Sequence, residues 1–155
     1  MTNTSRRHFF KNSAAVSATT LLGVSGLTAC GGGSSAASPL SSAEQLELTA
    51  TEVLAAYKSG RLSAATYVST LIARAKALSD LNAMISLNES AALAAAQKVD
   101  ADRAAGKALG ALAGLPIVVK DNINTKDMKT TGGTYSLRNF QPSSNAPSLQ
   151  RLIDA

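Results

Sequence analysis

Three consecutive β-branched residues, Ile117, Val118 and Val119, constrain the fold of this 155-residue chain more than any other feature. They follow Pro116, whose missing N–H does least harm at the start of a strand. An uninterrupted β-branched run is typical of a strand that is buried on both faces of a parallel sheet. The sequence therefore predicts that residues 117–119 lie inside a sheet.

Three polar residues, Lys120, Asp121 and Asn122, come directly after this predicted strand. Burial disfavours the charged form of a lysine, so a lysine at the end of a buried strand is suited to act as a general base. The alternative is a lysine that only emerges from the sheet and pairs with Asp121, since long basic side chains commonly reach solvent in this way. Spacing and composition leave both interpretations open.

Helical signals occupy the region before this strand. The segment from Thr49 to Glu52 has the pattern of a capping box at the start of a helix, and Gly60 is placed to end that helix. Ser63 is expected to open a second helix, and Asn88 a third helix that runs through Ala105 to Gly106. Folded structure is expected to begin near Glu44.

Charge and residue counts exclude several kinds of site. The formal net charge is +5, but residues 1–29 carry three of the basic residues, and the remainder has 12 Lys+Arg against 10 Asp+Glu. Because these form no basic run or stripe, no nucleic-acid partner is expected. Cys30 is the only cysteine and His8 the only histidine. The chain after residue 30 therefore cannot form a Ser-His-Asp, Cys-His or Cys/His zinc site from its own residues.

The first 30 residues have the pattern of an export leader. Residues 5–11 contain the pair Arg6-Arg7 and resemble a twin-arginine signal, and a modestly apolar stretch too short for a membrane span follows. Leu27-Thr28-Ala29-Cys30 resembles a bacterial lipobox. The alternative is a chance arginine pair before a buried helix. We expect an exported protein held by lipid on Cys30 at the periplasmic or cell-surface face of a membrane.

These signals divide the chain into three parts: a signal peptide at 1–29, the lipidated cysteine with a Gly/Ser linker at 30–43, and a folded domain at 44–155. The leader and the linker are expected to be disordered, because Gly, Ser and Ala dominate the linker.

Three segments of the folded part resemble the amidase signature family of Ser–cis-Ser–Lys amide hydrolases. The most specific is Gly114-Leu115-Pro116-Ile117-Val118-Val119-Lys120-Asp121-Asn122-Ile123, which is similar to the family segment that ends in the catalytic lysine. The run Thr130-Thr131-Gly132-Gly133-Thr134 resembles the turn that follows, and residues 145–152 resemble the next helix. In that helix, Asn145 replaces the family's usual aspartate and Pro147 is a departure from the pattern, both tolerable at a cap and first turn.

Residues 83–87 are a short strand candidate. The resemblance implies an α/β fold: the N-terminal part of a mixed sheet covered by helices. It implies that Lys120 is the neutral base that activates a nucleophilic serine through a bridging serine, so that a carboxamide is hydrolysed through an acyl-serine. A small-molecule amide is the implied substrate, and no metal or organic cofactor is implied. Further residues near the site would be Asp121, Asn122, Thr131, Gly132 and Gly133.

The family's two serines follow later in the chain, beyond Asp154-Ala155. Downstream of Lys120 the chain contains Ser136, Ser143, Ser144 and Ser148, but none has the glycine-rich surroundings of a nucleophile turn. The run Gly31-Gly32-Gly33-Ser34-Ser35 looks like the family's nucleophile loop, but it precedes Lys120 and is interpreted as linker. We therefore expect an N-terminal amidase fragment that is inactive alone and needs the C-terminal part to bind substrate.

Two other functions stay open. One is the A subunit of a tRNA-dependent amidotransferase, against which the leader argues because charged tRNA is cytoplasmic. The other is a membrane-tethered lipoprotein fragment with no enzymatic activity, for which the absent serines argue.

Overall fold

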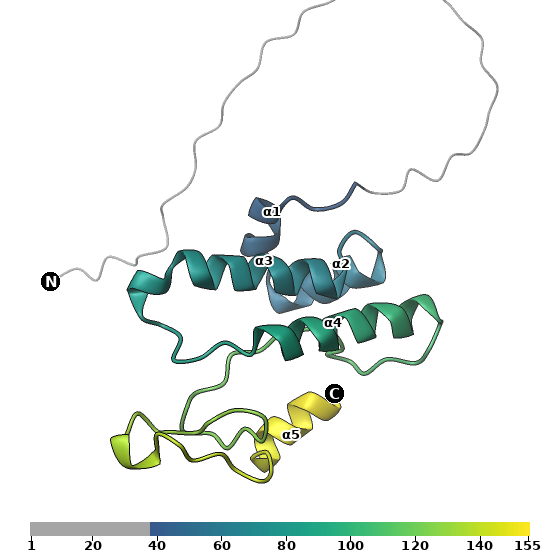
Figure 1. Cartoon of the computed structure of the whole chain (residues 1–155). Helices are drawn as coiled ribbons and strands as arrows, with labels where there is room; N and C mark the ends of the chain where they lie inside the picture. Colours follow the sequence, from purple (N-terminus) through teal and green to yellow (C-terminus); the bar gives the residue numbers. More distant parts are fainter. Residues whose placement is uncertain (1–37) are drawn as a thin grey trace, which may run out of the picture. The chain divides into compact units, whose positions relative to one another are not determined.

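The computed structural model describes residues 38–155, and all regular structure within this range is helical (Figure 1). The predicted signal peptide, Cys30 and most of the predicted linker lie outside this range. Within it, no helix has the length and apolar character that a membrane span requires. The elements are α1 (Ser42–Glu47), α2 (Ala50–Lys58), α3 (Ala64–Ala77), the 3-10 helix η1 (Ser79–Leu81), α4 (Glu89–Ala104), the 3-10 helix η2 (Tyr135–Leu137) and α5 (Pro147–Asp154).

The predicted capping box at the start of α2 is confirmed. The Thr49 hydroxyl accepts a hydrogen bond from the Glu52 N–H at 3.4 Å, and the Glu52 carboxylate accepts one from the Thr49 N–H at 2.8 Å. These bonds satisfy backbone donors that have no partner inside a helix. Ser41 and Glu44 form a second capping box, which starts α1 and was not predicted. At the other end of α2, Gly60 has a φ of +71°, as expected of a glycine that ends a helix.

The starts of α3 and α4 lie where they were predicted, but they are capped differently. Ser63 is the N-cap of α3 and accepts a hydrogen bond from the Thr66 N–H at 3.1 Å. The carboxylate of Asp100, which projects from α4, adds bonds from the N–H groups of Ala64 at 2.8 Å and Ala65 at 2.9 Å. Asn88 precedes α4 as predicted, but its side chain makes no capping bond.

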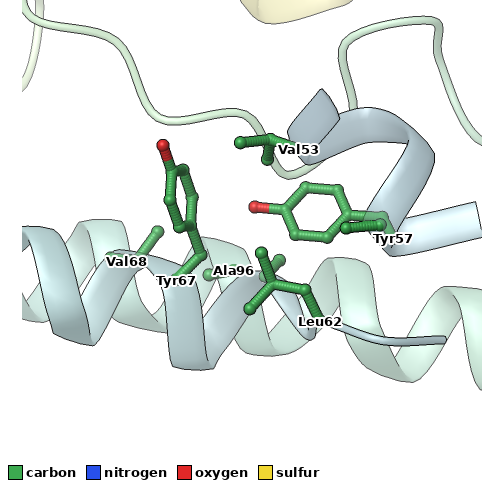
Figure 2. Packing of buried hydrophobic residues seen from close by; sticks show 8 residues of the cluster. Val53, Tyr57, Leu62, Tyr67, Val68 and Ala96 are labelled. Atoms are coloured by element: carbon green, nitrogen blue, oxygen red, sulfur yellow. The ribbon is translucent and has the colours of Figure 1, made fainter. Parts of the chain in front are cut away.

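The hydrophobic core lies among α2, α3 and α4. The rings of Tyr57 on α2 and Tyr67 on α3 meet edge to face, with centroids 6.4 Å apart and planes inclined by 77° (Figure 2). Ala96 is buried on α4, where its small side chain lets the helix approach the cluster. The cluster consists of Val53, Ala56, Tyr57, Leu62, Ala64, Tyr67, Val68 and Ala96.

The predicted sheet is not formed within residues 38–155. The segments 83–87 and 117–119 contain no strand, and Ile117 and Val118 expose 44% and 78% of their surface. None of the backbone N–H or C=O groups of 117–119 makes a hydrogen bond to another described residue. A strand needs a neighbouring extended segment to complete its ladder, and the helices of this region offer none. The β-branched run is therefore unpaired and half exposed instead of buried.

Candidate active site

The segment that carries Lys120 begins at Gly114, where it packs on the helical core. The hydroxyl of Tyr57 donates a hydrogen bond to the Gly114 carbonyl oxygen at 2.9 Å. Gly114 has a φ of +86°, a conformation that favours glycine, and a Cβ at this position would lie 2.9 Å from the Ala64 Cβ. It would also lie 3.2 Å from the Val99 Cγ1. Both the backbone conformation and the available space therefore require glycine here.

Lys120 lies in a turn after the extended run 117–119. Its carbonyl oxygen accepts a hydrogen bond from the Ile123 N–H at 2.9 Å. Its side chain is exposed and makes no ion pair with any residue in the range 38–155. The buried environment that the sequence predicted for Lys120 is absent here, because the sheet that would create it is not formed. Of the alternative, the solvent exposure of Lys120 is observed, but its pair with Asp121 is not formed within residues 38–155.

Asp121 is bonded to the Thr131–Gly133 turn instead. Its carboxylate accepts hydrogen bonds from the Thr131 N–H at 2.9 Å, from the Thr131 hydroxyl, and from the Gly133 N–H at 3.2 Å. The hydroxyl of Thr131, followed by the backbone N–H groups of the turn, holds the pKa of Asp121 below its ordinary value. Asp121 is therefore the anionic centre around which this loop folds.

The turn opposite Asp121 depends on two adjacent glycines. Gly132 and Gly133 have φ values of +56° and +69°, and the Gly132 N–H donates to the Asp121 carbonyl oxygen at 3.1 Å. No atom lies within 4 Å of where either glycine would carry a Cβ. Backbone conformation and not lack of space therefore requires glycine at both positions. With Thr131 they point a row of N–H groups at one aspartate.

The structure thus joins four of the predicted site residues, Asp121, Thr131, Gly132 and Gly133, in one hydrogen-bonded turn beside Lys120. Asn122 is exposed, and its side chain makes no hydrogen bond to any residue from 38 to 155.

Two polar residues that stabilise this loop were not predicted as part of it. Thr130 is 6% exposed, and its hydroxyl accepts from the Thr125 N–H at 3.3 Å and donates to the Ile123 carbonyl oxygen at 3.5 Å. Asn145 was expected at a helix cap, but Ala146 is the N-cap residue of α5. The Asn145 side-chain oxygen instead accepts from the Lys126 N–H at 2.8 Å. The run from Thr130 to Thr134 was the sequence signal for the turn, and no signal indicated the contact between Asn145 and Lys126.

The four serines downstream of Lys120 are all exposed and lie outside this network. Within the described range, no serine hydroxyl lies within hydrogen-bonding distance of the Lys120 amine, and no cluster of three or more His, Cys, Asp or Glu side chains is arranged to hold a metal ion. The serines in question are Ser136, Ser143, Ser144 and Ser148.

Comparison with known proteins identifies relatives of this chain. The A subunit of glutamyl-tRNA(Gln) amidotransferase from Lachnospira eligens is 40% identical over 111 residues, which cover 71% of this chain and 23% of that protein. The protein of the same name from Deinococcus deserti is 42% identical over 110 residues, covering 71% and 22%. A third, from Thermobifida fusca, is 40% identical over 113 residues, covering 72% and 23%. The chain spans less than a quarter of the length of these relatives.

The sequence model of the amidase family matches residues 66–155, which is more than half of the chain and includes Lys120 and the Asp121 turn. The chain belongs to the amidase family.

Proposed function

We propose that this chain supplies the general base, Lys120, of an amide hydrolase that works through an acyl-serine intermediate. The observation that carries the proposal is the engagement of Asp121. The Asp121 carboxylate is bonded to Thr131 and Gly133, and the neighbouring Lys120 amine has no anionic partner in the range 38–155. A lysine without a counterion is easier to keep neutral once it is buried, and a base must be neutral.

In the proposed reaction, the remaining part of the domain supplies the bridging and nucleophilic serines. Neutral Lys120 takes a proton from the bridging serine, which takes the proton of the nucleophilic serine as that oxygen attacks the amide carbonyl carbon. Backbone N–H groups stabilise the oxyanion, and the C–N bond breaks as the leaving nitrogen gains a proton. Water then attacks the acyl-serine and releases the carboxylic acid. In the complete domain, we propose that residues 117–119 pair with other strands of a mixed sheet and so bury the base of the Lys120 side chain.

The test uses the complete open reading frame that contains this chain, purified and assayed on a panel of small aliphatic and aryl carboxamides. Lys120→Ala is expected to lower kcat by about 10²- to 10⁴-fold, the usual contribution of a general base. Lys126→Ala is the matched control, because Lys126 is an exposed lysine in the same loop. Hydroxylamine added during turnover should trap the acyl group as a hydroxamate with the parent enzyme. Full activity after Lys120→Ala would contradict the proposed role.

A second candidate function follows from the names of the relatives. All three relatives described above are named as the A subunit of glutamyl-tRNA(Gln) amidotransferase. If this chain belongs to such a protein, it will be found in the cytoplasm with an intact N-terminus and will support amide transfer to glutamyl-tRNA(Gln). Hydrolysis of free carboxamides without tRNA, by protein recovered from a membrane fraction, would favour the hydrolase instead.

The proposal also includes the location of the enzyme. Arg6, Arg7 and the Leu27–Cys30 motif support export followed by lipid attachment to Cys30, which would hold the hydrolase at the outer face of a bacterial membrane. Its substrates would then be amides met outside the cytoplasm.

A further inference from the structure

The contact between Tyr57 and Gly114 is the last hydrogen bond from the helical core before Lys120 within residues 38–155. After Gly114, the Leu115 N–H donates to the Leu112 carbonyl oxygen at 2.9 Å, and residues 116–119 then make no backbone hydrogen bond to another described residue until the turn at Lys120. Whatever fixes the start of this stretch therefore limits where Lys120 lies.

Tyr57 is itself held on several sides. It is 1% exposed, and the guanidinium of Arg103 lies 5.0 Å from the centre of its ring. Arg103 in turn pairs with Asp100 at 3.3 Å, and the same carboxylate caps α3. Figure 2 shows the Tyr57 ring within the hydrophobic cluster, edge to face with Tyr67. The Tyr57 ring, which belongs to α2, thus contacts side chains of both α3 and α4, and these contacts hold its hydroxyl in place.

The chemistry of this contact also favours a fixed geometry. Burial raises the pKa of Tyr57, so the hydroxyl keeps the proton that it donates to Gly114. Gly114 lies against the core, since a Cβ at this position would be 2.9 Å from the Ala64 Cβ. Two residues later, Pro116 fixes its own φ and restricts Leu115 to extended backbone. The first half of the path from Gly114 to Lys120 is therefore stiff.

We infer that Tyr57 is a positioning residue for Lys120: its hydrogen bond to Gly114 fixes the origin and direction of the segment that presents the lysine. This inference rests on the proposed function only in giving Lys120 a catalytic role. The placement of the segment can be measured without any activity.

The first experiment measures that placement in the full 155-residue chain. Cys30→Ser removes the only native cysteine, and spin labels are attached to cysteines introduced at Gln97, which is exposed on α4, and at Lys120. Tyr57→Phe removes only the hydroxyl and is expected to broaden the distribution of distances between the labels. Tyr67→Phe is the matched control, because the Tyr67 hydroxyl makes no hydrogen bond in the described range, and it should leave the width unchanged. An unchanged width in Tyr57→Phe overturns the inference.

The second experiment uses the complete amidase. Tyr57→Phe is expected to lower kcat about two- to tenfold, the effect of losing one hydrogen bond, with KM unchanged, and Tyr67→Phe to change neither. A residue that only stabilised the fold would lower the melting temperature without changing kcat per folded molecule. If Lys120→Ala abolishes hydrolysis while Tyr57→Phe keeps the parent kcat, the positioning role is wrong and the proposed function stands. If Lys120→Ala remains active, the proposed function fails, and the label distances still decide whether Tyr57 fixes the segment.

Discussion

The carboxylate of Asp121 accepts hydrogen bonds from both the backbone N–H and the hydroxyl of Thr131. The two residues are 10 positions apart, and the segment between them folds back so that the glycine turn closes on the residue next to Lys120. The loop around the candidate base is thus organised by one negative charge. Such a loop should respond to pH, to the loss of that charge, and to changes at the glycines that shape it.

Acidification is expected to open the Asp121 turn. The Thr131 hydroxyl and the backbone N–H groups hold the pKa of Asp121 below the ordinary value of an aspartate. A depressed pKa in the folded state means that the stabilisation is fully present above the ordinary value and is lost as the pH falls through the lower folded value. The amide chemical shifts of Thr131 and Gly133 should therefore change with a midpoint below the ordinary pKa of an aspartate. Asp121→Asn should remove this transition; its persistence in that variant would show that another group causes it.

Substitution of Gly114 should cost more than substitution of Gly106. Both have positive φ, but a Cβ on Gly106 would meet no atom within 4 Å, whereas one on Gly114 would lie 2.9 Å from Ala64. Gly106→Ala should lower the free energy of unfolding by about 1–2 kcal/mol, from backbone strain alone. Gly114→Ala should lower it by about 1–3 kcal/mol more, because the core must also accommodate the methyl group. Chemical denaturation of the full chain measures both, and equal losses would contradict the close approach at Gly114.

Two aspartates on α4 should differ in their contribution to stability. Asp100 caps the N–H groups of Ala64 and Ala65, so Asp100→Ala should lower the free energy of unfolding by about 1–3 kcal/mol by leaving those donors without a partner. Asp102 pairs only with the exposed amines of Lys98 and Lys107, and ion pairs of this kind contribute little. Asp102→Ala is therefore the control, expected to change thermal stability slightly. A larger loss from Asp102→Ala than from Asp100→Ala would contradict this assignment.

The leader proposal predicts a mass change at Cys30. In a bacterial host with twin-arginine export, the protein should be recovered from membranes with Cys30 as its first residue and carrying acyl chains, as measured by intact mass. Cys30→Ser should prevent lipid attachment. The double variant Arg6→Lys, Arg7→Lys should leave the unprocessed precursor in the cytoplasm. Recovery of this double variant from the membrane fraction with lipid on Cys30 would show that a different route exports the protein.

The starts of the helices were predictable because their signals are local. Thr49 and Ser63 each bond to an N–H group three positions further on, so a short stretch of sequence contains both partners. The Asp100 cap of α3 could not be read in this way, because the carboxylate comes from another helix and the residues it bonds lie 35 and 36 positions earlier. The hydrogen bond between Tyr57 and Gly114 joins residues 57 positions apart, and neither the sequence around Tyr57 nor that around Gly114 indicates it.

The predictions of a strand at 117–119 and of a buried Lys120 were both wrong for residues 38–155, and for the same physical reason. Three β-branched residues favour extended backbone, but pairing and burial depend on segments far away in sequence. Among the described residues the run has no partner strand and stays unpaired, and the lysine that follows it stays exposed. The Asp121 turn was predicted as a set of residues near the site, but its organising contact was not, because the sequence equally suggested a pair with Lys120.

The run from Ile117 to Val119, which is unpaired within residues 38–155, also bears on the fate of this polypeptide in the cell. Exposed apolar side chains beside free backbone donors and acceptors are a template for intermolecular β-pairing, and they are the kind of surface that chaperones retain and proteases cleave. Pro116, before the run, has no N–H to donate to another strand, and Lys120, after it, is charged. Residues of these two kinds oppose intermolecular β-pairing, so the segment that favours aggregation is limited to three residues. The same two residues that frame the candidate catalytic segment would thus limit its aggregation until a partner strand covers it.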